Sequence, residues 1–168
     1  MCTLCMRCIY VCPMKIDIPQ LVFNVRKSKP REERPKGILG SCDMALRSDT
    51  CSAMGAGEED FQFVVEDVLE EVQQLQPGFE DLKAPVNKQG AEYFLNQNSR
   101  EPVTEPDEMV PLWKILHTVD CDWTYGTKGW AAENYCMFMA DLDNWEHIVR
   151  TKAKAVDDLG CKYWLNTE

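Results

Sequence analysis

The residues best suited to chemistry are four cysteines near the start of the chain. Two, two and three residues separate them, and a proline follows the last, in the order Cys2, Cys5, Cys8, Cys12 and Pro13. Tight turns between closely spaced thiolates bring the first three sulfurs towards one point, where they can wrap one face of a 4Fe-4S cluster. The spacing therefore predicts that Cys2, Cys5, Cys8 and Cys12 bind iron–sulfur clusters.

Closely spaced cysteines have two other common uses. A structural zinc site usually draws on paired Cys-x2-Cys units that are well separated in sequence, and buried unreactive thiols show no regular spacing. Neither matches the run from Cys2 to Cys12 as well as an iron–sulfur site does. A non-catalytic module, with zinc on these cysteines and an acidic helix that docks a partner, is the alternative from a different functional class.

The run has the spacing of bacterial ferredoxins, and this raises the question of the missing ligands. In two-cluster ferredoxins the fourth cysteine of one run binds the other cluster. Cys12 would then serve a second cluster, and the cluster on the first three cysteines would need a thiolate from an upstream run, or from Cys42 or Cys51. We therefore expect the sequence to be part of a longer protein with two 4Fe-4S clusters.

The other five cysteines are scattered through the chain, at Cys42, Cys51, Cys121, Cys136 and Cys161. An odd total of nine without a signal peptide favours a reducing compartment over a disulfide scaffold. We expect Cys121 and Cys161 to be structural. Cys136 follows a predicted strand, where α/β sheets build their sites, so it is either a site residue or a buried hydrophobe. His117 and His147 are expected to be ordinary helix residues.

The net charge of −10 is unevenly distributed. Residues 1–36 hold eight Lys or Arg against three acids, and the remainder holds ten against twenty-five. The basic residues lack interleaved aromatics, which excludes a nucleic-acid interface. No apolar stretch is long enough to span a bilayer. We expect a cytoplasmic protein, either free or held at the inner membrane by the other subunits of a redox complex.

Hydrophobic periodicity predicts the order of helices and strands. An apolar stripe predicts an amphipathic helix over 58–75, with acids at its start. The other predicted helices are 20–27, 107–118 and 142–159, the last with Asp141 as N-cap and Gly160 as stop, and the predicted strands are 82–86, 91–95, 122–125 and 161–165. Alternating strands and helices indicate a parallel sheet, so the later part is expected to be a doubly wound α/β unit.

Three regions follow from this pattern. Residues 1–36 are the ferredoxin-type segment, 37–78 a linker loop with the amphipathic helix, and 79–168 part of an α/β domain. Gly, Pro and Ser are frequent over 28–57, which predicts a surface loop there. The polar and aromatic loop 122–130 is the best candidate for a pocket outside the cysteine run. Nucleotide-binding and hydrolase motifs are absent from the sequence.

Several segments together resemble a known family. The run Cys2–Pro13 is followed by Met14-Lys15-Ile16-Asp17-Ile18-Pro19, and later come Met54–Asp60, Ala84–Ala91 and Gly129–Tyr135. These segments resemble the iron–sulfur subunit of heterodisulfide-reductase-like membrane redox complexes of sulfate- and sulfur-metabolising microbes. The resemblance implies a helical two-cluster ferredoxin joined to a cysteine-rich α/β domain, which in relatives binds a further iron–sulfur centre and handles a thiol or disulfide.

The resemblance implies electron transfer through 4Fe-4S to a thiol/disulfide site, as one component of an oxidoreductase. The sequence departs from the family because it has no Cys-Cys-Gly, and Asn134-Tyr135-Cys136 stands where that motif would be sought. The nearest rival is the iron–sulfur subunit of a glycolate, lactate or glycerol-3-phosphate dehydrogenase. Its Cys-Cys-Gly motifs would identify it, and the sequence lacks them too.

Overall fold

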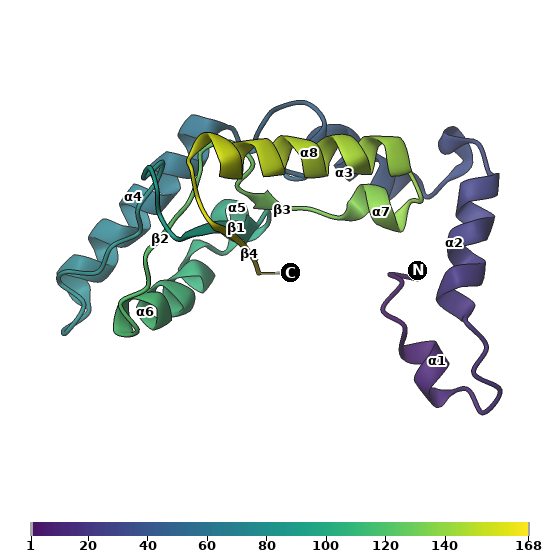
Figure 1. Ribbon diagram of the computed structural model, residues 1–168, viewed down its shortest axis with the longest axis horizontal. Coiled ribbons are helices and arrows are strands. Elements are labelled where there is room, and N and C mark those ends of the chain that lie inside the picture. Colours follow the sequence, from purple (N-terminus) through teal and green to yellow (C-terminus); the bar gives the residue numbers. More distant parts are fainter. Residues whose placement is uncertain (1, 168) are drawn as a thin grey trace.

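The computed structural model describes residues 2–167 and combines helices with a small parallel sheet (Figure 1). The helices are α1 (Arg7–Val11), α2 (Ile18–Ser28), η1 (Arg31–Glu33), α3 (Lys36–Ala45), α4 (Glu58–Leu75), α5 (Glu101–Thr104), η2 (Pro106–Met109), α6 (Val110–Thr118), α7 (Tyr135–Phe138) and α8 (Leu142–Asp158). The strands are β1 (Tyr93–Asn98), β2 (Trp123–Thr124), β3 (Ala131–Ala132) and β4 (Tyr163–Asn166). The mixed α/β class predicted from the sequence is confirmed.

β1 is the central strand of the sheet. It pairs in parallel with β2, β3 and β4, and Tyr93 lies opposite both Trp123 and Tyr163. Successive side chains of a strand point to opposite faces, so Leu95 packs with α4 and α6 whereas Phe94 packs with α8. Figure 1 shows α8 on one side of β1 and α6 on the other. Helices therefore cover both faces, as in doubly wound folds.

One predicted strand is wrong and another is displaced. Residues 82–86 form no strand, because only Val86 makes an isolated parallel bridge, to Tyr125. Pro85 lies in this stretch and has no amide hydrogen to donate to a ladder. The strand predicted at 91–95 is β1, which begins and ends later in the chain.

The two long helices agree with the prediction. α4 spans the predicted 58–75, and Asp60 in its first turn accepts a hydrogen bond of 2.9 Å from the amide of Gly57. α8 is followed by Gly160, which has a φ of 66° as expected of a C-terminal stop. Asp141 is the N-cap residue of α8, as predicted, but its side chain makes no capping hydrogen bond. Its carboxylate accepts a hydrogen bond of 2.7 Å from Nε of Arg31 instead.

The loop predicted over 28–57 contains regular structure. Both η1 and α3 lie within it, and α3 buries Cys42 and Ala45 completely or nearly so. Gly37 and Gly40 lower the intrinsic helix propensity of α3. Burial of the opposite face outweighs this low propensity, which is why composition alone misassigned the segment.

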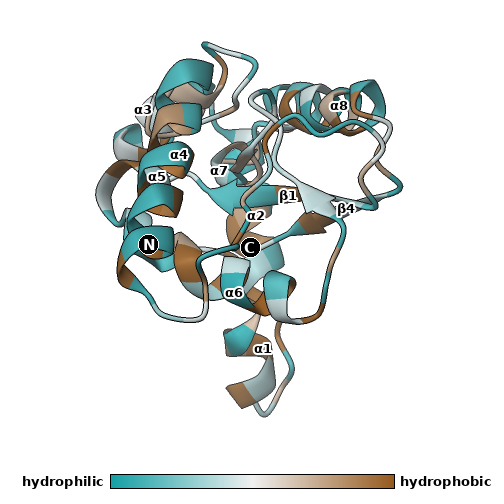
Figure 2. Ribbon diagram, turned by 90° about the vertical axis from the view of Figure 1, so that its left-hand side faces the viewer, coloured by the Kyte–Doolittle hydropathy of each residue, from teal (hydrophilic) through white to brown (hydrophobic). Residues whose placement is uncertain are grey.

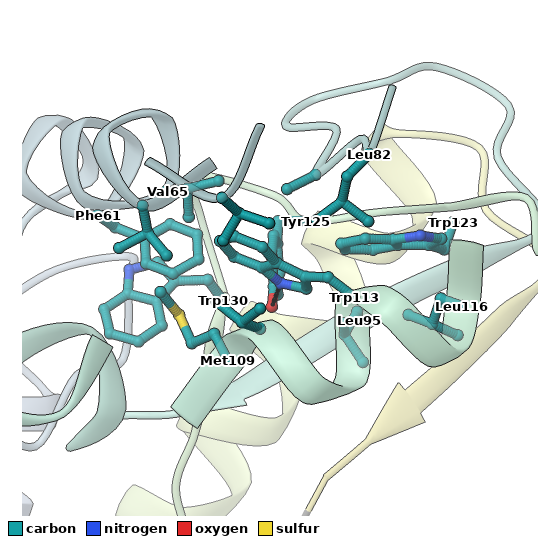
Figure 3. Close-up of a cluster of buried hydrophobic side chains, with 14 of the residues drawn as sticks. Phe61, Val65, Leu82, Leu95, Met109, Trp113, Leu116, Trp123, Tyr125 and Trp130 are labelled. Carbon is teal, nitrogen blue, oxygen red and sulfur yellow. Dashed lines mark hydrogen bonds between the residues drawn. The ribbon is translucent and has the colours of Figure 1, made fainter. Parts of the chain in front are cut away.

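The main core lies between the sheet, α4 and α6 (Figure 3). Phe61 from α4 stacks on Trp130 with ring centroids 4.3 Å apart and meets the edge of Tyr125 at 5.2 Å. The hydroxyl of Tyr125 accepts from Nε1 of Trp113 at 2.8 Å and donates to the side-chain oxygen of Gln97 at 2.6 Å. Burial raises the pKa of this hydroxyl. Four packed aromatic rings, and the hydrogen bonds that link Trp113, Tyr125 and Gln97, thus fix α4 and α6 on the sheet.

The segment that carries the cysteine run lies at one end of the molecule (Figure 1). Figure 2 shows α1 projecting beyond the other elements, with hydrophobic residues on its ribbon. Large apolar side chains of α1, α2 and the intervening loop are exposed, among them Tyr10, Val11, Met14, Leu21 and Val25. Among the described residues, no helix is both long and apolar enough to cross a membrane.

Candidate iron–sulfur site and adjoining pocket

The backbone of the cysteine run has an unusual conformation. Leu4 and Met6, which flank Cys5, both have left-handed φ angles, 60° and 65°. This conformation costs free energy for residues other than glycine, and residues strained in this way are often found at ligand-binding sites.

Two backbone amides of the run contact cysteine sulfurs. The amide of Leu4 lies 3.4 Å from Sγ of Cys2. The amide of Arg7 donates to Cys5, and this bond is the largest of the effects that lower the pKa of the Cys5 thiol. Amide hydrogen bonds stabilise thiolates, and hydrogen bonds to sulfur also tune iron–sulfur centres.

All four cysteines of the run are free thiols. Cys5 and Cys8 are exposed, and Cys2 and Cys12 are partly buried. Among residues 2–167, no three potential metal ligands lie close enough together to hold an ion. Four closely spaced thiols are the donor set that a 4Fe-4S cluster uses, and binding one would require the side chains or turns of the run to move together.

Cys42 and Cys51, the sequence candidates for a fourth ligand, lie elsewhere. Both belong to a second core between α3, α7 and α8, which also holds Cys136 and none of the cysteines of the run. The thiols of Cys42 and Cys136 are hydrogen-bonded to each other, and this bond together with burial raises the pKa of Cys136. Burial raises the pKa of Cys51 to about 11. Buried thiols with raised pKa values, such as Cys51 and Cys136, are unreactive. Cys42 is fully buried in the same core, so all three have a structural role here.

The remaining sequence candidates have ordinary surroundings. Cys121 packs against the main core, and Cys161 packs against Phe94 and α8. Both are only partly buried, and burial raises the pKa of each thiol. His117 lies at the end of α6 with Nε2 3.5 Å from a carboxylate oxygen of Asp81. His147 is exposed on α8.

A pocket of about 360 Å³ lies at the carboxyl ends of β1 and β3. Asn98 ends β1 and Ala132 ends β3, and both line it. The chain leaves β1 towards α6 on one face of the sheet and leaves β3 towards α8 on the other. Two adjacent strands whose connections diverge in this way form a topological switch point, where open α/β sheets bind their ligands. Met54, Arg100, Tyr135 and Phe138 complete much of the wall.

Buried polar contacts hold the wall of this pocket, which we call the switch-point pocket. A carboxylate oxygen of Glu133 accepts hydrogen bonds of 2.8 Å from the amides of Asn134 and Tyr135. Lys152, only 3% exposed, reaches from α8 to within 3.3 Å of the carbonyl oxygen of Glu133. These bonds fix the connection between β3 and α7.

Residues of the loop 122–130 line two cavities, as predicted, but not the switch-point pocket. Most of it is buried in the sheet, including Trp123, Tyr125 and Trp130. Its Gly126–Lys128 part lines a separate cavity of about 220 Å³, and Asp122 and Trp123 line another of about 610 Å³ at the opposite end of β2. The switch-point pocket was missed because locating it requires the ends of β1 and β3, which the sequence pattern does not define.

The chain matches no protein-family model, and no curated protein or solved structure is significantly similar to it.

Proposed function

We propose that this chain is the iron–sulfur electron-transfer component of an oxidoreductase, with Cys2, Cys5, Cys8 and Cys12 as the cluster ligands. The observation that carries the proposal is the run itself. Four free thiols at ferredoxin spacing lie on a backbone with left-handed Leu4 and Met6 and with amides directed at sulfur. A 4Fe-4S cluster bound there would accept and release single electrons.

The proposed electron acceptor is a disulfide bound in the switch-point pocket, which two successive electrons from the cluster and two protons would reduce to two thiols. The sequence resemblance to heterodisulfide-reductase-like subunits suggests this chemistry, and the position of the pocket supports it. The pocket lies beside α7, to which the cysteine segment is attached by hydrogen bonds. Its wall mixes an exposed guanidinium, amide groups and aromatic rings, which suits a small polar substrate.

Iron and acid-labile sulfide analysis of anaerobically purified protein tests the iron–sulfur proposal. We expect about four iron and four sulfide per chain, and an EPR signal that appears on reduction with dithionite. Zinc without sulfide would refute the proposal and favour the interaction module. If the protein still contains no metal after anaerobic reconstitution with iron and sulfide, the four cysteines of the run do not bind a cluster in this chain.

We propose that other redox subunits dock on the exposed surface of α1 and α2. Val11 and Met14 are 81% and 79% exposed, and Lys15 and Lys27 lie in the same segment. An apolar centre with charged surroundings is typical of protein interfaces. Such docking would hold the chain at the cytoplasmic side of a membrane-bound redox complex.

Anaerobic co-purification tests the docking proposal. A tagged wild-type chain should retain a haem- or iron-containing protein, and the Val11→Asp/Met14→Asp double variant should retain roughly fivefold less, because it buries charge at the contact. Val119→Asp changes a residue that is 66% exposed on another element and serves as the control. Equal retention by all three proteins would exclude this surface.

A further inference from the structure

Three arginines of the N-terminal segment bind the same short stretch of chain after α7. Arg26 donates to the carbonyl oxygen of Phe138 at 2.5 Å, and Arg34 donates to the carbonyl oxygen of Met139 at 3.0 Å. Arg31 donates to the carboxylate of Asp141 at 2.7 Å and to that of Asp43 at 2.5 Å. The stretch 138–141, which we call the α7 turn, is thus held from one side by three guanidinium groups.

Local backbone hydrogen bonds close the turn, because the amide of Asp141 donates to the carbonyl oxygen of Cys136 at 2.9 Å and the amide of Ala140 to that of Met137 at 2.9 Å. Burial raises the pKa of Asp141, but the hydrogen bonds from Arg31 and Asn144 together with the charges of Arg31 and Arg34 outweigh it, so the pKa is lowered and the carboxylate stays ionised. Ala140 has a left-handed φ of 56°, which a non-glycine residue keeps only when its surroundings impose it. The α7 turn is therefore closed by its own backbone, and the three arginines attach it to the N-terminal segment.

Arg26 differs from the other two arginines because it also binds the cysteine run. Its second terminal nitrogen donates to the carbonyl oxygen of Cys2 at 2.7 Å. The side chain is buried, and one planar guanidinium spans the backbone of Cys2 and the backbone of Phe138. Arg suits this task because its donors form a rigid fork, whereas a lysine ammonium is a single point. Charge-assisted bonds of this length are about twice as strong as neutral ones.

Phe138 and Tyr135 line the switch-point pocket from α7. The same guanidinium therefore contacts the first ligand residue of the run and the element that forms the pocket wall. We infer that Arg26 is a positioning residue that holds the Cys2 end of the iron–sulfur site against the wall of the switch-point pocket. The role of Cys2 as a cluster ligand rests on the proposed function. The coupling of the cysteine run to the α7 turn rests only on the two hydrogen bonds of Arg26.

Hydrogen–deuterium exchange of the metal-free chain tests the coupling without a cluster. In Arg26→Gln, amide exchange should rise at least fivefold both in the cysteine run and in the α7 turn. Arg34→Gln is the matched control, because Arg34 binds the turn and not the run. It should raise exchange in the turn and leave the run unchanged. Arg26→Gln with wild-type exchange in either segment would overturn the inference.

The iron-loaded protein supplies the second test. Arg26→Gln should lose iron to a chelator at least fivefold faster than wild type. Its midpoint potential should be lower, because a buried positive charge near the ligands favours the reduced state. Arg26→Lys keeps the charge but not the fork, so its potential should return towards wild type while its iron loss stays fast.

The exchange and iron-loss experiments distinguish failure of the proposed function from failure of the positioning role of Arg26. If the wild-type chain takes up no iron, the proposed function fails and the exchange experiment still decides the coupling. If wild type takes up iron and Arg26→Gln matches it in iron loss and potential, the positioning role fails and the proposed function stands.

Discussion

Replacement of Cys5 and Cys8 together by alanine should abolish iron binding and leave the fold intact. Both side chains are exposed and outside every core, so their removal creates no cavity. Each supplies one thiolate to the proposed cluster, and an iron atom that loses its protein ligand is open to solvent and to release. Reconstituted Cys5→Ala/Cys8→Ala should hold at least roughly tenfold less iron and sulfide than wild type.

Two controls make this experiment specific. Cys161→Ala also removes a free thiol, in this case a partly buried one at the start of the segment that leads into β4, and it should keep the wild-type iron content. The metal-free double variant and the metal-free wild-type chain should have the same circular dichroism spectrum. Wild-type iron content in the double variant would show that other residues hold the metal and would remove the run from the site.

Phe61→Ala should lower the free energy of unfolding by about 3–5 kcal/mol. Phe61 is fully buried, stacks on Trp130 and meets the edge of Tyr125. Its removal leaves a cavity where α4 meets the sheet, and the flat rings on either side cannot close it without leaving their own positions. Domains of this size are stable by about 5–15 kcal/mol, so the loss is a large share of the total.

Phe63→Ala provides the matched control on the same helix. Phe63 lies two residues further along α4, on the opposite side, and is 67% exposed. Its replacement should change the free energy by less than about 0.5 kcal/mol. Urea unfolding followed by tryptophan fluorescence measures both variants. Equal effects of the two substitutions would contradict the packing of α4 on the sheet.

Long helices with a regular apolar pattern were predicted correctly, and some short or irregular elements were not. α4 and α8 repeat an apolar stripe over several turns, and burial of that stripe alone is enough to define a helix. α3 has two glycines and no long stripe, so its helix depends on the burial of Cys42 and Ala45 against α7 and α8. β3 consists of two alanines and is a strand only because β1 lies beside it.

Some functional residues could likewise be predicted from the sequence, and others could not. The cysteine run could be identified from the sequence because its ligands are close neighbours, and the turns between them are local. The switch-point pocket could not, because it is made by the ends of two strands that pair only in the folded chain. Arg26 gave no sequence signal at all, since its partner Phe138 lies 112 residues away.

By itself, the sequence determined the spacing of the four thiols, the main helices and the parallel α/β class, because each depends on local periodicity or local ligand geometry. Only the tertiary structure decided that Cys42, Cys51 and Cys136 are buried together away from the run. It also decided that one guanidinium joins the run to the pocket wall. Such contacts depend on how distant segments pack, and no local pattern encodes that packing.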